Sequence, residues 1–175
     1  NNLIILSDEI YTDLSFDKKY ESISKYYPDD TFISSGLSKW CGAGGWRLGF
    51  IAVPQKHKSF METMKNLASE TYSTVNTPTQ YAAVEAYKGD YSNYLNNTIK
   101  ILNAVGQYVY TNLKSNKVLI NQPQGGFYLM PEFINVNLKD SSKLCEVILK
   151  ETGVALLPGS DFGFSPKKMI ARLSF

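Results

Sequence analysis

A glycine-rich loop between two short apolar runs constrains the fold of this chain most strongly. The runs are residues 31–34 and 48–53, and the loop between them contains Gly42, Gly44 and Gly45. Short apolar runs bounded by turn residues are typical of strands buried on both faces. The pattern therefore predicts two strands on either side of the loop, and residues 3–6 predict a third strand of the same kind.

Chemically active side chains gather around this loop. Lys39 follows Ser38 among small residues, and such a lysine can offer a lightly solvated amine to an aldehyde. Arg47 lies eight residues later, and a guanidinium can hold a phosphate by paired charge-assisted hydrogen bonds. Asp8 and Tyr11 follow the first apolar run. Each residue alone is an ordinary surface feature, but together they indicate a cofactor site.

The motifs that hold these residues read SDEIY at 7–11 and SKWCGAGGWRLG at 38–49. They resemble motifs of the class I and II aminotransferases, which are pyridoxal-phosphate (PLP) enzymes of fold type I. The resemblance implies that Lys39 bonds covalently to PLP and that Ser38 and Arg47 belong to the phosphate cup. It also implies that Asp8 faces the pyridine nitrogen and that Tyr11 lies near the 3-oxygen of the ring.

One position departs from the family pattern. Many relatives carry a serine or threonine three residues before the lysine as a phosphate ligand, and this chain has Gly36 there. Ser35 or the backbone N–H of Gly36 could replace that hydroxyl, and the sequence leaves both options open.

Three later segments extend the resemblance: PQGGFYL at 123–129, GVALLPGSDFG at 153–163 and ARLSF at 171–175. In the family pattern Arg172 binds the α-carboxylate of the substrate, for which a planar guanidinium is well suited. The resemblance also places the C-terminal part of the PLP-binding large domain at residues 1–105 and a partial small domain at residues 106–175. Tyr72 and Asn76 are expected to reach the active site of a neighbouring subunit in a homodimer.

Both ends of the chain look cut, because Asn1 directly precedes an apolar run and Phe175 lies inside another. In the family, the glycine-rich phosphate loop and the aromatic residue that stacks on the pyridine ring precede the Asp8 segment. We therefore expect the chain to be the C-terminal portion of a longer enzyme and to be inactive alone.

Composition argues against several classes of partner. Lys plus Arg is 18 and Asp plus Glu is 16, so no net field attracts nucleic acid or an anionic membrane. No apolar run approaches the ~20 residues of a membrane span. Cys41 and Cys145 show neither metal spacing nor a disulfide framework, which favours a reducing, cytoplasmic compartment. No metal site is expected. His57 is expected at the surface and Glu9 as a loop or surface charge.

Helical patterns alternate with the short apolar runs that predict strands, as in an α/β fold. Apolar residues at 60–68 indicate one helix, and a second is predicted to begin with Thr77 as cap, Pro78 in the first turn and Gln80 in a capping box. That helix should end at Gly89, and a longer one should cover residues 91–109. A short helix ending at Gly153 should lie between strands at 127–130 and 154–157.

The favoured function is PLP-dependent transfer of an amino group between an α-amino acid and a 2-oxo acid. Thr71 occupies the position where dicarboxylate-specific relatives place a distal arginine, which argues against aspartate as the obvious substrate. Two alternatives remain open. One is a PLP-dependent C–S lyase or decarboxylase on the same fold, and the other is a non-catalytic aminotransferase-like effector domain of a transcription regulator.

Overall fold

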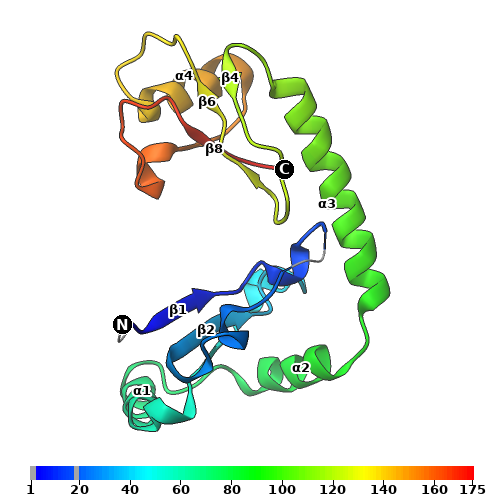
Figure 1. Ribbon diagram of the computed structural model, residues 1–175, viewed down its shortest axis with the longest axis vertical. Coiled ribbons are helices and arrows are strands. Elements are labelled where there is room, and N and C mark those ends of the chain that lie inside the picture. Colours follow the sequence, from blue (N-terminus) through cyan, green and yellow to red (C-terminus); the bar gives the residue numbers. More distant parts are fainter. Residues whose placement is uncertain (1–2, 18–19) are drawn as a thin grey trace. The chain divides into compact units, whose positions relative to one another are not determined.

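The computed structural model describes residues 3–17 and 20–175, and Figure 1 shows the order of the elements. The chain divides into two compact units, Asn1–Asn96 (unit 1) and Asn97–Phe175 (unit 2). The division falls near the start of helix α3 (Ser92–Leu113).

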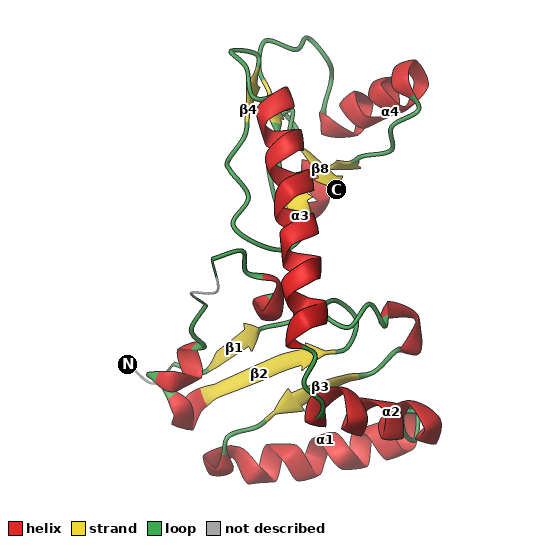
Figure 2. Ribbon diagram, turned by 90° about the vertical axis from the view of Figure 1, so that its right-hand side faces the viewer, coloured by secondary structure: helices red, strands yellow, loops and turns green. Residues whose placement is uncertain are grey.

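Unit 1 contains a three-stranded sheet in the order β1-β2-β3. Strand β1 (Ile5–Asp8) is parallel to β2 (Thr31–Gly36), and β2 is antiparallel to β3 (Gly49–Ala52). Asp8 therefore pairs with Ser34, and Gly36 pairs with Gly49. The carboxyl ends of β1 and β2 and the beginning of β3 meet at one edge of the sheet (Figure 2).

The expected strands near 3–6, 31–34 and 48–53 are confirmed, with β1 beginning at Ile5 rather than at Leu3. Burial on both faces is wrong for β3, where Phe50 is 44% exposed and only Ile51 is half-buried, and it is also wrong for β1. Ile4 is 66% exposed and Leu6 is 67% exposed, and exposed residues alternate with half-buried ones along the strand. Only one face of β1 is covered, because successive side chains of a strand point to opposite sides.

Helices α1 (Lys58–Thr71) and α2 (Thr77–Lys88) follow β3 (Figure 2). Phe60 of α1 packs edge-on against Phe32 of β2, with ring centroids 5.4 Å apart, so the predicted apolar face of α1 does contact the sheet. Helix α2 ends before Gly89, as the sequence predicts.

The predicted start of α2 is wrong by one residue. Asn76 is the N-cap, because its side-chain oxygen accepts a hydrogen bond from the Thr79 N–H at 3.0 Å. Thr77 is already helical. Gln80 forms no capping box, since its amide donates instead to the Val75 carbonyl at 2.6 Å.

Unit 2 is built from short strands. Strand β4 (Val118–Leu119) pairs with β6 (Glu132–Phe133), and β5 (Tyr128–Leu129), β8 (Ala171–Ser174) and β7 (Leu157–Pro158) form an antiparallel sheet in the order β5-β8-β7. The strand expected at 127–130 is confirmed as β5. Only the end of the strand expected at 154–157 is formed, because residues 154–156 have irregular backbone.

Helix α4 (Ser141–Thr152) covers this unit and contributes to its core. The core consists of buried residues from α4, from the segment that leads into β8 and from the start of β8: Leu144, Cys145, Met169 and Ala171. Asp140 caps the start of the helix by accepting from the Lys143 N–H at 2.8 Å. Gly153 ends it with a left-handed φ of 74° and an N–H that donates to the Leu149 carbonyl, which confirms the expected C-cap.

Among residues 3–17 and 20–175, no helix has the length and apolar character needed to cross a bilayer.

Candidate functional site

The edge of the unit 1 sheet where β1 and β2 end collects five of the predicted site residues. Asp8 is the last residue of β1, and Lys39 follows the end of β2 by three residues with Ser38 beside it. Arg47 precedes β3 by two residues, and Tyr11 lies in the turn after β1. Open α/β sheets bind ligands outside the carboxyl ends of their strands, so this edge is where a ligand is expected.

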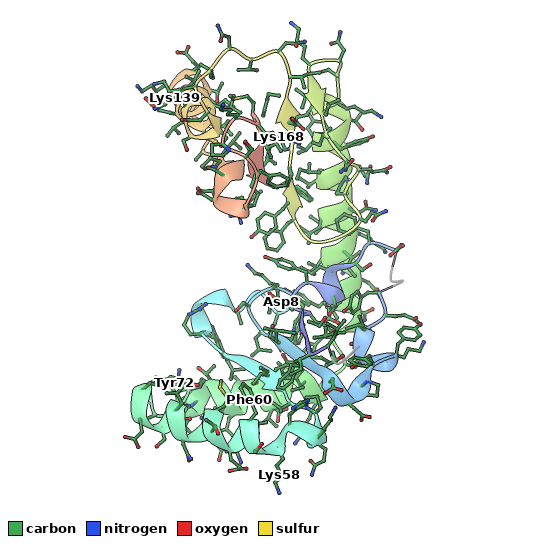
Figure 3. The ribbon with its side chains drawn as sticks, turned by 60° about the vertical axis from the view of Figure 1, so that its left-hand side comes forward. Asp8, Lys58, Phe60, Tyr72, Lys139 and Lys168 are labelled. Carbon is green, nitrogen blue, oxygen red and sulfur yellow. The ribbon has the colours of Figure 1, made fainter. Side chains whose placement is uncertain are left out.

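The turn after β1 is fixed by main-chain hydrogen bonds. The Glu9 N–H donates to the Ser34 carbonyl at 2.8 Å, which extends the pairing of β1 with β2 beyond Asp8. Thr12 donates its hydroxyl to the Glu9 carbonyl at 3.0 Å, and Leu14, only 1% exposed, anchors the following 3-10 turn. The Asp8 side chain itself is exposed at the sheet edge (Figure 3).

Lys39 and Tyr11 are brought together although 28 positions separate them in the sequence. The Lys39 Nζ atom lies 5.3 Å from the centroid of the Tyr11 ring, within the range of a cation–π contact. Lys39 is half-buried. The amine is therefore held against a phenol at the edge of the sheet.

The loop that carries Lys39 is ordered by its own backbone. The Ala43 N–H donates to the Leu37 carbonyl at 3.2 Å, and the Gly42 N–H donates to the Lys39 carbonyl at 3.2 Å. Gly42 has a φ of +65°, which a glycine adopts without strain. Leu37 is 1% exposed and ties the loop to the interior of unit 1.

Arg47 ends this loop in an unusual backbone conformation. Its φ is 53°, in the left-handed region that non-glycine residues rarely adopt. One guanidinium nitrogen, Nη1, donates to the Gly44 carbonyl at 2.8 Å. A guanidinium has five N–H donors, so this bond orients Arg47 and leaves donors that can reach a phosphate.

Gly36 cannot be replaced by a larger residue on this backbone. An added Cβ atom would lie 2.6 Å from the Leu48 carbonyl oxygen and 2.8 Å from the Gly49 Cα atom. Both neighbours are main-chain atoms of the segment that enters β3. The strand approach therefore requires glycine, and the hydroxyl that many relatives carry here has no room.

A cavity of about 580 Å³ lies behind the Lys39 loop within unit 1. Its walls come from the loop, from α2 and from the start of α3, and they include Trp40, Trp46, Tyr91, Tyr94 and Glu85. None of Asp8, Tyr11, Lys39 and Arg47 lines this cavity. The candidate site is thus the sheet edge rather than this cavity.

Arg172 lies in unit 2, on β8. Its Cζ atom is 4.5 Å from the ring centroid of Tyr128 and 4.5 Å from that of Phe162. Its Nε atom is buried and finds no hydrogen-bond partner in the part of the chain that the structure describes. Since burying an unpaired donor costs free energy, the arrangement favours an incoming anion such as a carboxylate.

Tyr72 and Asn76 flank the connection between α1 and α2. Tyr72 is 67% exposed at the end of α1 (Figure 3). Asn76 uses its side-chain oxygen within the chain, because that oxygen accepts from both the N–H and the hydroxyl of Thr79. Contact of either residue with a second subunit stays a prediction.

His57 is not the surface residue that the sequence predicts. Its side chain is 22% exposed, its Nε2 atom lies 2.7 Å from Asp30 Oδ1, and its ring packs against Phe32 at 5.1 Å. Lys56 binds the same carboxylate at 2.7 Å. The hydrogen bond from Lys56, and then that from His57, lowers the pKa of Asp30 below its usual value. The partners are 26 and 27 residues apart, so no local signal reveals them.

Known aminotransferases are similar to this chain along its whole length. The family model described as "Aminotransferase class I and II" matches residues 1–175. The chain is 32% identical over 174 residues to a probable N-acetyl-LL-diaminopimelate aminotransferase of Bacillus subtilis and 36% identical over 177 residues to an aspartate aminotransferase of Thermotoga maritima. Each alignment covers 99% of this chain and 43% of the relative.

A solved structure, an aromatic aminotransferase from Pyrococcus horikoshii OT3, superposes with a TM-score of 0.88 at 31% identity. The superposition covers 99% of this chain and 46% of that one. This chain therefore spans less than half the length of the relatives and the structure that it matches here.

Proposed function

Because the chain belongs to the class I and II aminotransferases and has the α/β architecture of fold type I, we propose that it serves PLP-dependent amino-group transfer. The substrates are an α-amino acid and a 2-oxo acid. The observation that carries the proposal is the Lys39 amine held 5.3 Å from the Tyr11 ring, at the sheet edge where β1 ends in Asp8.

The donor set at this edge fits PLP group by group. PLP, when bound, supplies an aldehyde that bonds to amines and a ring that accepts electrons. An amine, a carboxylate and a phenol are available in Lys39, Asp8 and Tyr11, and Arg47 with Ser38 offers donors for a phosphate. The absence of space at Gly36 leaves Ser35 or the Gly36 backbone N–H as the replacement for the missing hydroxyl.

Each residue then has a defined role. Asp8 holds the proton on the pyridine nitrogen, because an ionised carboxylate stabilises a cation beside it. Tyr11 donates its phenol hydrogen to the 3-oxygen. Lys39 Nζ first holds the cofactor and later moves a proton to and from the substrate α-carbon. Arg172 orients the substrate through its α-carboxylate.

The wider setting is part of the same proposal. We propose a cytoplasmic homodimer in which Tyr72 and Asn76 contact the neighbouring subunit, and the 67% exposure of Tyr72 supports such a contact. We also propose that residues 1–105 belong to the large PLP-binding domain and residues 106–175 to the small domain.

The test is chemical labelling of the protein that contains this chain. Purified protein should absorb visible light with PLP bound, and borohydride should fix the label on Lys39, as peptide mapping would detect. The Lys39→Ala variant is the matched control and should take no label. A label on another lysine would overturn the assignment.

A second measurement separates transfer from elimination. With an α-amino acid and a 2-oxo acid acceptor together, a new amino acid should form. Release of ammonia and a 2-oxo acid without any acceptor would identify a lyase instead.

A further inference from the structure

Glu9 lies between two proposed cofactor ligands, Asp8 and Tyr11, yet it points to a different part of unit 1. The sequence predicts it to be a loop or surface charge, and it does lie in the loop directly after β1, where it is half-buried and hydrogen-bonded. The Ser22 hydroxyl donates to Glu9 Oε1 at 2.6 Å, across 13 positions of sequence. The side chain therefore connects the turn after β1 to a segment that packs beside it.

Ser22 is itself held in place. It is the N-cap of a 3-10 turn (Ile23–Lys25), where its Oγ atom accepts from the Ser24 N–H at 3.2 Å and lies 2.8 Å from the Ser24 hydroxyl. Tyr20 also hydrogen-bonds Glu9, and burial followed by this bond raises the pKa of the Tyr20 phenol. The hydrogen-bond partners of the Glu9 carboxylate thus belong to a segment that is held in place by its own hydrogen bonds.

The backbone of Glu9 is fixed as well. Its N–H donates to the Ser34 carbonyl at 2.8 Å, and its carbonyl accepts from the Thr12 N–H and hydroxyl. Side chain and main chain are therefore both restrained at a residue that adjoins Asp8 and precedes Tyr11 by two positions. A displacement of the Glu9 backbone would therefore disturb Asp8 and the turn that leads to Tyr11.

We propose that Glu9 is a positioning residue, whose bond to Ser22 fixes the turn from Asp8 to Tyr11 in the orientation that PLP requires. This inference rests on the proposed function. Glu9 does not touch the cofactor in this role. It acts by limiting the directions in which the Asp8 carboxylate and the Tyr11 phenol can point, and small displacements of such groups are costly.

The experiment is a double-mutant cycle of Glu9→Ala and Ser22→Ala in the protein that contains this chain. Glu9→Gln is the conservative variant, because it keeps an oxygen that can accept from Ser22. Glu21→Ala is the matched control. It removes an exposed glutamate of the same segment, which has Lys25 and Tyr26 as its own partners.

Two readouts are taken. In cofactor-free protein, hydrogen exchange of the amides of residues 10–14 reports on the turn. With PLP added, its dissociation constant and the pH midpoint of its visible band report on Asp8 and Tyr11. Each alanine variant should accelerate exchange and weaken PLP binding about tenfold, as expected for losing a charged hydrogen bond.

Both substitutions break the Glu9–Ser22 bond, and Glu9→Ala also removes the bond to Tyr20. The double variant should therefore bind PLP about as weakly as Glu9→Ala alone. Glu9→Gln should stay within about threefold of wild type, and Glu21→Ala should be unchanged. Additive losses, or unchanged PLP affinity and pH midpoint despite faster exchange, would overturn the inference. Unchanged hydrogen exchange in Glu9→Ala would also overturn the inference, whether or not the protein binds PLP. Failure of the wild-type protein to bind PLP is a separate result, and it would reject the proposed function.

Discussion

The two units hold their proposed site cations in different ways. In unit 1, Lys39 stands on a loop whose shape comes from main-chain hydrogen bonds such as Ala43 N–H to Leu37 O, and its amine lies against one ring. In unit 2, Arg172 lies between two rings beside Ala171, which is completely buried. Backbone bonding survives the loss of a side chain, whereas packing does not. Changes at Lys39 should therefore affect chemistry alone, and changes around Arg172 should affect binding and stability together.

The largest effect is expected at Lys39. Lys39→Arg keeps a cation near Tyr11 but removes the primary amine, so turnover of the enzyme should fall on the order of 10³- to 10⁴-fold. The melting temperature should change little, because the loop keeps its backbone bonds. Steady-state transamination assays and thermal unfolding measure the two. A large drop in the melting temperature of Lys39→Arg would show that Lys39 contributes to stability, as the residues around Arg172 in unit 2 are expected to do.

Arg172→Lys should give the next largest effect. A lysine cannot offer paired donors or fill the space between Tyr128 and Phe162. For every amino acid tested, kcat/KM should therefore fall by a factor that corresponds to about 2–5 kcal/mol of lost transition-state stabilisation. The visible spectrum of bound PLP should be preserved. Phe162→Leu removes one ring only and should cost about 1 kcal/mol. Unchanged kinetics in Arg172→Lys would assign the residue a structural role.

Packing in unit 2 can be tested away from the site. Leu144 is 4% exposed in the core of unit 2, and Leu144→Ala should lower the free energy of unfolding by about 3 kcal/mol. Leu149 lies on the same helix and is 49% exposed, so Leu149→Ala should cost well under half of that. Denaturant unfolding gives both values. Equal losses would mean that this core does not stabilise unit 2.

A smaller effect is expected at the start of α2 in unit 1. Asn76→Ala should lower stability by about 1 kcal/mol, the usual loss of an N-cap, while Asn76→Asp should retain most of it. Thr77→Ala is the control, because the sequence pattern names Thr77 as the cap and the structure names Asn76. If Thr77→Ala proves the more destabilising by thermal unfolding, the structural assignment fails.

The smallest effect concerns pH. The pKa of Asp30 is lowered by Lys56 and then by His57, so the native state favours the ionised form. The stabilisation is complete above the unfolded pKa of about 3.9 and disappears as pH falls through the lower native value. Asp30→Asn should therefore reduce the melting temperature at pH 6, and the reduction should become smaller as the pH falls below about 3.9.

In unit 2 the corresponding acid is Glu146, whose bonds to Lys150 and Lys143 lower its pKa to about 2. It is an exposed group on the surface of α4, so salt should weaken its contribution readily. The Asp30 side chain is only 13% exposed, so salt should weaken its contribution to stability less than that of Glu146. A stronger salt dependence of the Asp30 contribution would contradict this expectation.

Local sequence patterns predicted the helices and strands, but they did not predict contacts between residues that are far apart in the sequence. The helices and the Gly153 cap followed from spacing and from single residues, because these features depend on neighbours along the chain. The cap at Asn76 was missed by one position, since both Asn and Thr can cap. Five site residues were named from motifs, and the structure places them on one sheet edge. The bonds of Glu9 with Ser22 and of Asp30 with His57 had no local signal.

The close approach at Gly36 also restricts how this lineage can change. A serine at position 36 would collide with the backbone of residues 48 and 49, and both atoms that its Cβ would meet belong to the main chain. A hydroxyl at this position is therefore compatible only with a different path of the backbone at residues 48 and 49. A variant designed to carry a hydroxyl here must therefore also widen the path into β3, so the two changes have to be made together.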